Sequence, residues 1–156
     1  MYHLKRVRKT DIISLLKAAD ILNKCGKDMA LKNNLHHWDN PYLKSILIIL
    51  LSSWKNIIYL LYDGRQPVAT FQIKKDGETL HFEKLGTRPS KSGKGAGSYC
   101  MKTIEQLAEK KGCKKVSMEV YELSEHAITF YENKGYNVVG SANTLKYREV
   151  IMEKSI

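Results

Sequence analysis

Two Asp-Gly dipeptides constrain the fold of this chain more than any other feature. The dipeptides at 63–64 and 76–77 separate three runs rich in β-branched and aromatic residues, at 57–62, 68–74 and 79–87. Asp-Gly readily adopts the positive backbone dihedral angles that tight hairpin turns need. The three runs are therefore expected to form an antiparallel meander.

The pattern changes after the meander. A loop at 89–98 leads into 98–111, where apolar residues recur at helical spacing, and 115–121 again has the composition of a strand. A helix of this length between two strands makes the strands 79–87 and 115–121 parallel neighbours. The remaining expected elements are a first strand at 2–7, a helix that begins at Thr10 or Asp11 and stops at Gly26, helices at 42–54 and 124–134, and closing strands at 136–140 and 145–152.

These elements predict an α/β (α+β) fold. Its central sheet is mixed and mostly antiparallel, with one parallel β-α-β crossover and helices on both faces. The chain has 156 residues, 43% of them hydrophobic and 27% charged, which is typical of a globular protein that buries one core. Without a linker or an internal repeat, residues 1–156 are expected to form a single domain.

The cysteines and the apolar runs indicate in which cellular compartment the protein is expected. The chain has three cysteines, Cys25, Cys100 and Cys113. An odd number of cysteines without C-x-x-C spacing favours neither a disulfide framework nor a zinc site. The longest apolar run, 46–51, has six residues, whereas a membrane span needs about 20. The first residues carry charges but no apolar stretch of a secretory signal. We therefore expect cytoplasmic residence and no membrane partner.

The net charge of +10 fits more than one partner. A basic surface can bind nucleic acid, or it can serve a cofactor with several phosphates. A nucleic-acid-binding module remains an alternative, although no helix-turn-helix, finger or aromatic RNA motif is present. Because the lysines are scattered over the whole chain, a solvated basic surface is a further alternative.

A glycine-rich loop, Ser92-Gly93-Lys94-Gly95-Ala96-Gly97-Ser98, stands between a predicted strand and a predicted helix. Glycines at alternate positions let a ligand approach the backbone closely. The first N–H groups of the following helix lack partners and attract anions. The loop therefore predicts a phosphate site, with a flexible surface loop as the alternative.

Two familiar phosphate motifs fit the loop poorly. A Walker loop would need glycine where Arg88 stands, and serine or threonine where Gly95 stands. A Rossmann fingerprint starting at Gly95 would end at Cys100 instead of glycine or alanine. Glu119 does follow at a suitable distance for a ribose contact, but the fingerprint normally follows the first strand of a parallel sheet.

Two segments resemble motifs of the GNAT superfamily of N-acetyltransferases. Residues 85–97, LGTRPSKSGKGAG, resemble the pattern L-A-V-x-P-x-x-R-G-x-G-[IVA]-G. Residues 124–136, SEHAITFYENKGY, resemble N-x-x-A-x-x-[FL]-Y-E-K-x-G-[FY]. Ser92 replaces the family's arginine or glutamine, and Ser124 replaces its asparagine, although Ser124 can still cap the helix.

The resemblance implies an enzyme that transfers an acetyl group from acetyl-CoA to a primary amine by direct attack. Pantetheine would pair with the backbone near Leu85 and Thr87, and the pyrophosphate would bind the N–H groups of 93–98. The implied cofactor-binding residues are Leu85, Gly86, Thr87, Ser92, Gly93, Lys94, Gly95, Ala96, Gly97, Ser98, Ser124, Tyr131 and Lys134. A CoA-binding sensor of the same fold without catalytic activity is an alternative.

The resemblance also implies catalytic residues. Tyr131 holds the position of the family's tyrosine acid, and a phenol stays protonated at neutral pH. Strand alternation predicts His81, Glu83, Leu85 and Thr87 on one face. Glu83 is the first candidate for the base that deprotonates the amine, and His81 is the second. Alternatively, Glu83 and His81 are ordinary surface residues and Tyr131 belongs to the core.

The acceptor is expected to bind opposite the cofactor, against the N-terminal half. His36, His37, Trp38 and Tyr42, with His81, could hold a small-molecule or peptide amine through cation–π contacts. The alternative is a loop anchored by a buried Trp38. Two adjacent histidines without other ligands do not indicate a metal site. The sequence leaves the acyl-chain preference open, and also whether the chain forms a homodimer.

Overall fold

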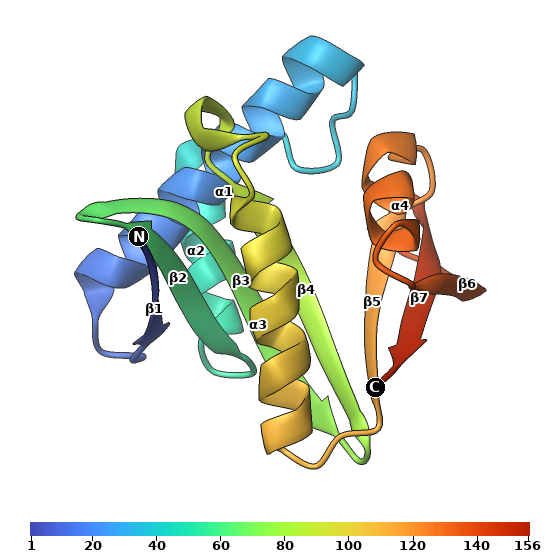
Figure 1. The fold of residues 1–156 in the computed structure, drawn as a ribbon. Helices are drawn as coiled ribbons and strands as arrows, with labels where there is room; N and C mark the ends of the chain where they lie inside the picture. The colour runs from blue at the N-terminus through green and yellow to red at the C-terminus, as the bar shows by residue number, and fades with distance from the viewer.

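A computed structural model describes residues 1–156, which form a seven-stranded sheet with helices on both faces (Figure 1). The strands are β1 (Tyr2–Val7), β2 (Ile57–Asp63), β3 (Gln66–Asp76), β4 (Thr79–Thr87), β5 (Lys115–Tyr121), β6 (Asn137–Asn143) and β7 (Arg148–Ser155). The helices are α1 (Ile12–Asn33), α2 (Tyr42–Ser52), α3 (Ala96–Lys110), α4 (Glu125–Glu132) and the short 3₁₀ helix η1 (Pro89–Lys91). The predicted fold class is confirmed. None of the helices has the length and apolar character required to cross a bilayer.

The sheet has the order β1-β2-β3-β4-β5-β7-β6, and only β4 and β5 are parallel neighbours. Their ladder is short, because it pairs only residues 79–81 of β4 with residues 115–117 of β5. Beyond these pairs the two strands diverge, and Figure 1 shows the resulting gap between β4 and β5. The carboxyl-terminal half of β4 therefore has a free edge toward β5.

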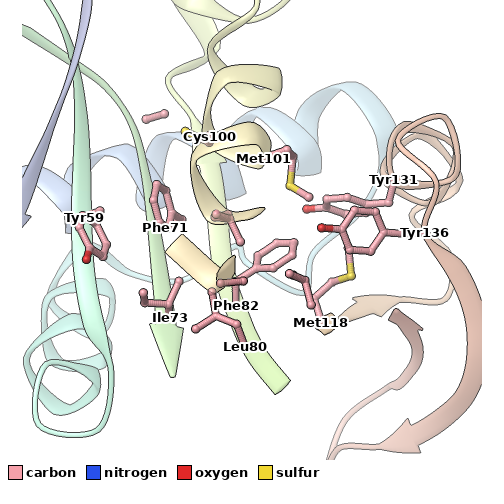
Figure 2. Close-up of a cluster of buried hydrophobic side chains, with 14 of the residues drawn as sticks. Tyr59, Phe71, Ile73, Leu80, Phe82, Cys100, Met101, Met118, Tyr131 and Tyr136 are labelled. Atoms are coloured by element: carbon pink, nitrogen blue, oxygen red, sulfur yellow. The ribbon is translucent and has the colours of Figure 1, made fainter. Parts of the chain in front are cut away.

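Apolar side chains form one core on each face of the sheet. The larger core holds buried residues of α3 and α4, among them Met101 and Tyr131, against strand residues such as Phe71 and Phe82 (Figure 2). The smaller core packs α1 and α2 against β2 on the opposite face. Alternation along β2 explains this division, since Leu60 belongs to the smaller core and Leu61 to the larger one.

Helix α1 is longer than the sequence predicts. The expected stop at Gly26 is wrong, because α1 continues to Asn33 and ends at Asn34, which has a left-handed conformation with φ of 54°. Gly26 instead allows another segment of the chain to pack closely against α1. A Cβ atom at this position would lie 1.9 Å from the backbone oxygen of Trp38. Glycine is therefore required so that the loop after α1 can pack directly against the helix.

Strand β4 contains a bulge that breaks its alternation. Lys84 has a left-handed backbone with φ of 52°, and the register of β3 against β4 shifts between Thr70 and Gln72. Leu85 packs against the same core as Phe82, and this face lies opposite Glu83. The prediction that His81, Glu83, Leu85 and Thr87 share one face is therefore wrong.

Candidate active site

The glycine loop ends at α3, which begins at Ala96, two residues before the predicted start. None of the main-chain N–H groups of residues 93–98 donates a hydrogen bond to a protein acceptor. The first helical bond is donated by Tyr99, to the carbonyl of Gly95 at 2.9 Å. Gly93 and Gly95 have φ of 73° and 88°, so both positions favour glycine. The loop therefore presents six unpaired donors at the positive end of a helix.

Aromatic side chains hold this loop in place. The hydroxyl of Tyr2, in β1, donates to the carbonyl of Lys94 at 3.0 Å. A Cβ atom on Gly97 would lie 3.4 Å from the ring of Phe130, so α4 packs closely beside the loop. The ammonium of Lys134 lies 4.8 Å from the centroid of the same ring. Lys134 is therefore a second cation, with Lys94, near the free N–H groups.

A groove of about 700 Å³ begins at Ser92 and follows the carboxyl end of β4 to the start of α4. It is lined by Cys25, Asp28, Met29, Lys32, Asn33, Leu35, Trp38, Leu85, Gly86, Thr87, Pro89, Ser92, Leu123, Glu125 and His126. Four of the predicted cofactor residues, Leu85, Gly86, Thr87 and Ser92, thus share one groove. We call it the cofactor groove.

Cys25 is a groove residue that sequence reasoning missed. Its thiol donates to the carbonyl oxygen of Thr87 at 2.9 Å. Burial raises the pKa of this thiol to about 12, so it stays protonated at neutral pH. Cys25 therefore acts as a hydrogen-bond donor that fixes the end of β4, and it is not a nucleophile. One carbonyl near the expected pantetheine path is already engaged.

A second cavity, of about 380 Å³, adjoins the groove at Met29, Trp38 and Leu85. We call it the acceptor cavity. The side chains predicted from the sequence that line it are His37, Trp38, Glu83, Leu85, Ser124 and Tyr131. Sequence reasoning did not assign Glu119, Tyr121, Tyr147 or Glu149 to an acceptor site, although all of them line this cavity. Its volume is in the range of small-ligand sites.

Tyr131 joins the acceptor cavity to the large core. Its ring centroid lies 5.9 Å from that of Phe82 and 6.2 Å from that of Tyr136 (Figure 2). Burial raises the pKa of its phenol above the usual value of 10.0. The hydroxyl of Tyr136 donates to Glu105 at 3.2 Å, whereas that of Tyr131 has no protein partner. Tyr131 is therefore a protonated phenol free to donate to a ligand.

Ser124 is also unpaired. It stands at the start of α4, is only 5% exposed, and its hydroxyl oxygen makes no hydrogen bond. The expectation that it caps α4 is wrong, since no side-chain capping bond forms. A buried hydroxyl without a hydrogen-bond partner is energetically unfavourable unless a ligand supplies that partner. Ser124 is therefore an unpaired polar group in the wall of the acceptor cavity.

The two candidate bases have different surroundings. The Glu83 carboxylate accepts hydrogen bonds from the amide of Asn56 and from the ammonium of Lys84, both at 2.7 Å. His81 lies outside both the groove and the cavity, where its Nε2 is 2.9 Å from Glu119. This pairing raises the pKa of His81 and lowers that of Glu119. Glu83 reaches the cavity directly, and His81 reaches it only through Glu119.

The predicted acceptor residues are split by the fold. His37 lines the acceptor cavity, with its ring centroid 4.6 Å from that of Tyr121. Burial lowers the pKa of His37 to about 4, so its ring is neutral at pH 7. Trp38 packs against the smaller core and lines both the groove and the cavity. His36 and Tyr42 are exposed and line neither space.

Comparison with known proteins agrees with this geometry. Residues 23–136 match the family model described as the acetyltransferase (GNAT) family. This chain belongs to the GNAT family. The matched region covers the groove, the glycine loop and α4, as the two sequence motifs predicted. The Rossmann interpretation is wrong, since the loop follows the fourth strand of a mixed sheet.

One curated protein and several solved structures are similar to this chain. The probable N-acetyltransferase 14 of Xenopus tropicalis is 25% identical over 112 residues, which are 70% of this chain and 54% of the relative. The chain thus spans about half the length of this curated relative. Two solved structures match all of this chain and 99% of their own. The first is PH1933 of Pyrococcus horikoshii, with a TM-score of 0.79 and 18% sequence identity. The second is the PaiA N-acetyltransferase of Thermoplasma acidophilum in complex with coenzyme A, with a TM-score of 0.75 and 15% sequence identity.

Proposed function

We propose that this GNAT chain transfers the acetyl group of acetyl-CoA to a primary amine by direct attack. One observation carries the proposal. Six main-chain donors without partners stand at the start of α3, and the adjacent groove leads into a cavity that holds a protonated phenol and a carboxylate. Anion binding, an extended ligand path and paired acid–base groups are what this reaction needs.

The residues of the groove fit coenzyme A. The N–H groups of residues 93–98 would bind its diphosphate, and Lys94 and Lys134 would add positive charge. The amide groups of coenzyme A would form hydrogen bonds with the free edge of β4 beyond residue 81, as an added strand would. Acetyl-CoA would supply the thioester, with a carbonyl carbon that accepts the amine nitrogen and a sulfur that leaves.

Glu83 is the side chain that we propose as the base. It takes the proton from the incoming ammonium, directly or through one water molecule, because only the neutral amine has a lone pair. Asn56 and Lys84 hold its carboxylate in position by hydrogen bonds. A main-chain N–H on the free edge of β4 would stabilise the negative charge that develops on the carbonyl oxygen. His81 is the second candidate, acting through Glu119.

Tyr131 would serve the departing sulfur. Burial raises the pKa of the Tyr131 phenol above its usual value of 10.0, so this phenol is a weaker acid than a thiol such as that of cysteine, with a pKa of about 8.5. Tyr131 therefore stabilises the developing thiolate mainly by donating a hydrogen bond. The proton removed from the amine can then complete the thiol.

Two measurements test the proposal. Calorimetry should detect binding of coenzyme A, and an assay of free thiol should detect turnover of acetyl-CoA with at least one member of a panel of amines and peptides. Coenzyme A binding without thiol release on the whole panel would favour a sensor without catalytic activity. Salt-sensitive binding of duplex DNA, with no heat on addition of coenzyme A, would favour a nucleic-acid-binding module.

A further inference from the structure

Three carboxylates line the acceptor cavity, and one of them lacks a cation. Glu83 pairs with Lys84 at 2.7 Å, and Glu119 pairs with His81 at 2.9 Å. Glu149, in β7, makes neither an ion pair nor a side-chain hydrogen bond. The wall of the cavity thus holds three carboxylates and one cation, Lys84, so it has an excess of negative charge although the chain as a whole carries +10.

The surroundings of Glu149 disfavour the ionised form of its carboxyl group. Its side chain is half-buried, and burial is the main cause that raises its pKa, followed by repulsion from Glu119 and Glu83. A positive group in the cavity would relieve both effects, because it would replace lost hydration and offset the repulsion.

Aromatic rings line the same cavity as this carboxylate. Tyr121 lies directly opposite Glu149 in the β5–β7 ladder, and its ring centroid is 5.1 Å from that of Tyr147. The neutral ring of His37 lies 4.6 Å from Tyr121 and 5.9 Å from Tyr147. Aromatic faces beside a carboxylate form a suitable site for an ammonium group. The unpaired hydroxyl of Ser124, 5% exposed, lines the same cavity and independently indicates a ligand there.

The reaction itself decides what this charge can bind. The attacking nitrogen has to be neutral when it reacts, so a lasting ion pair at that nitrogen would oppose the proposed chemistry. The excess negative charge therefore suits a second cationic group of the same molecule. We infer that the acceptor is a small aliphatic amine with a second positive charge, which Glu149 binds beside Tyr121 and Tyr147. This inference rests on the proposed acetyl transfer.

The test compares amines of equal length that differ only in the second charge. Thiol release is measured with 1,4-diaminobutane, n-butylamine and 4-amino-1-butanol, and 1,3-diaminopropane and spermidine extend the series. We expect kcat/KM for the best diamine to exceed that of its monoamine at least about tenfold, which corresponds to about 1.4 kcal/mol. In Glu149→Gln this ratio should fall below about threefold.

A matched variant and a binding measurement make the test decisive. Glu109→Gln removes one negative charge from the exposed surface of α3 and should leave the ratio intact. Equal rates for diamines and monoamines, or a ratio that Glu149→Gln leaves unchanged, would overturn the inference while the acetyl transfer stands. If no amine is acetylated, the proposed function fails. Calorimetry of 1,4-diaminobutane with the coenzyme A complex then decides, since the inference requires binding that Glu149→Gln abolishes.

Discussion

Burial and pairing set the protonation state of individual residues around the two cavities. Cys25, His37 and Tyr131 are kept neutral at pH 7, because burial disfavours their charged forms. The pair of His81 and Glu119 behaves in the opposite way, since each partner stabilises the charge of the other. Neutral Cys25 thus lines the groove, whereas the acceptor cavity combines neutral His37 and Tyr131 with the charged Glu119.

The hydroxyl of Tyr131 should contribute to turnover and not to cofactor binding. We expect Tyr131→Phe to lower kcat roughly 10- to 100-fold, toward the lower range of acid–base effects, with an unchanged Kd for coenzyme A. Tyr136→Phe is the matched control, because it removes a neighbouring buried hydroxyl that is bound to Glu105. Wild-type kcat in Tyr131→Phe would remove this residue from the mechanism.

The pair of His81 and Glu119 should make stability depend on pH. The pKa of His81 is raised above 6.5 and that of Glu119 is lowered below 4.5 in the folded state. The contribution of the pair is therefore complete between these two values, and it is lost as the pH rises through the folded pKa of His81 or falls through that of Glu119. We expect the difference in Tm between wild type and Glu119→Gln to shrink from pH 5.5 to pH 9. A constant difference would show that the pair does not titrate as proposed.

The sequence predicts some of these residues and not others for physical reasons. Ser92 could be placed at this groove because a phosphate loop has glycines at fixed positions after a strand, and Leu85 because it belongs to the segment that resembles a GNAT motif. The sequence could not predict Glu149 and Tyr147 in the cavity wall. They belong to a terminal hairpin without a recognisable motif, and only the pairing of β5 with β7 brings them to the cavity. The face of Leu85 was mispredicted because the bulge at Lys84 leaves no trace in the alternation of residue types.

At the scale of elements, most of the chain follows its local signals. The Asp-Gly turns give the β2–β3–β4 meander, and the apolar spacing of α3 places Met101 and Ile104 in the core. Boundaries fail where a distant segment decides them. Gly26 has the local character of a helix stop, yet α1 continues because the glycine accommodates the backbone of Trp38. The closing strands run three residues further than predicted, to Asn143 and Ser155, because they pair with each other and with β5.

The loop before α3 offers a test of the anion site. Gly95→Ala places a Cβ at a φ of 88°, and Gly112→Ala does so at 70°, with open space around both positions. Both variants should lose about 1–2 kcal/mol of stability from backbone strain alone. Only Gly95→Ala should also weaken coenzyme A binding, at least about tenfold, because it distorts the N–H donors. Calorimetry and thermal unfolding measure the two effects separately, and equal weakening in both variants would refute the assignment.

At the scale of the whole molecule, charge is distributed unevenly. The chain has 26 basic and 16 acidic residues, yet the acceptor cavity carries an excess negative charge. Under the proposed function, the basic surface would attract the phosphates of coenzyme A, and the acidic cavity would attract a cationic amine. Opposite local potentials in one protein can direct two substrates to opposite sides of the reaction centre.

This distribution predicts a salt effect that depends on the ligand. Raising NaCl from 0.05 to 0.5 M should weaken coenzyme A binding several-fold, because salt screens its phosphates from the lysines. Pantetheine lacks these phosphates and should bind with nearly the same Kd at both concentrations. Titration calorimetry at the two salt concentrations measures both. Equal salt dependence for the two compounds would contradict a phosphate site on the loop.

The three-residue ladder between β4 and β5 has a mechanical consequence. The sheet consists of two wings, β1–β4 and β5–β7, whose strands pair with each other only between residues 79–81 and 115–117. A ligand that pairs with the free edge of β4 would lie in the opening as a wedge, and it would stiffen the angle between the wings. Amide protons of β4 near the wedge would then exchange more slowly with solvent once it is in place. The substrate would thus complete the sheet that the polypeptide leaves open.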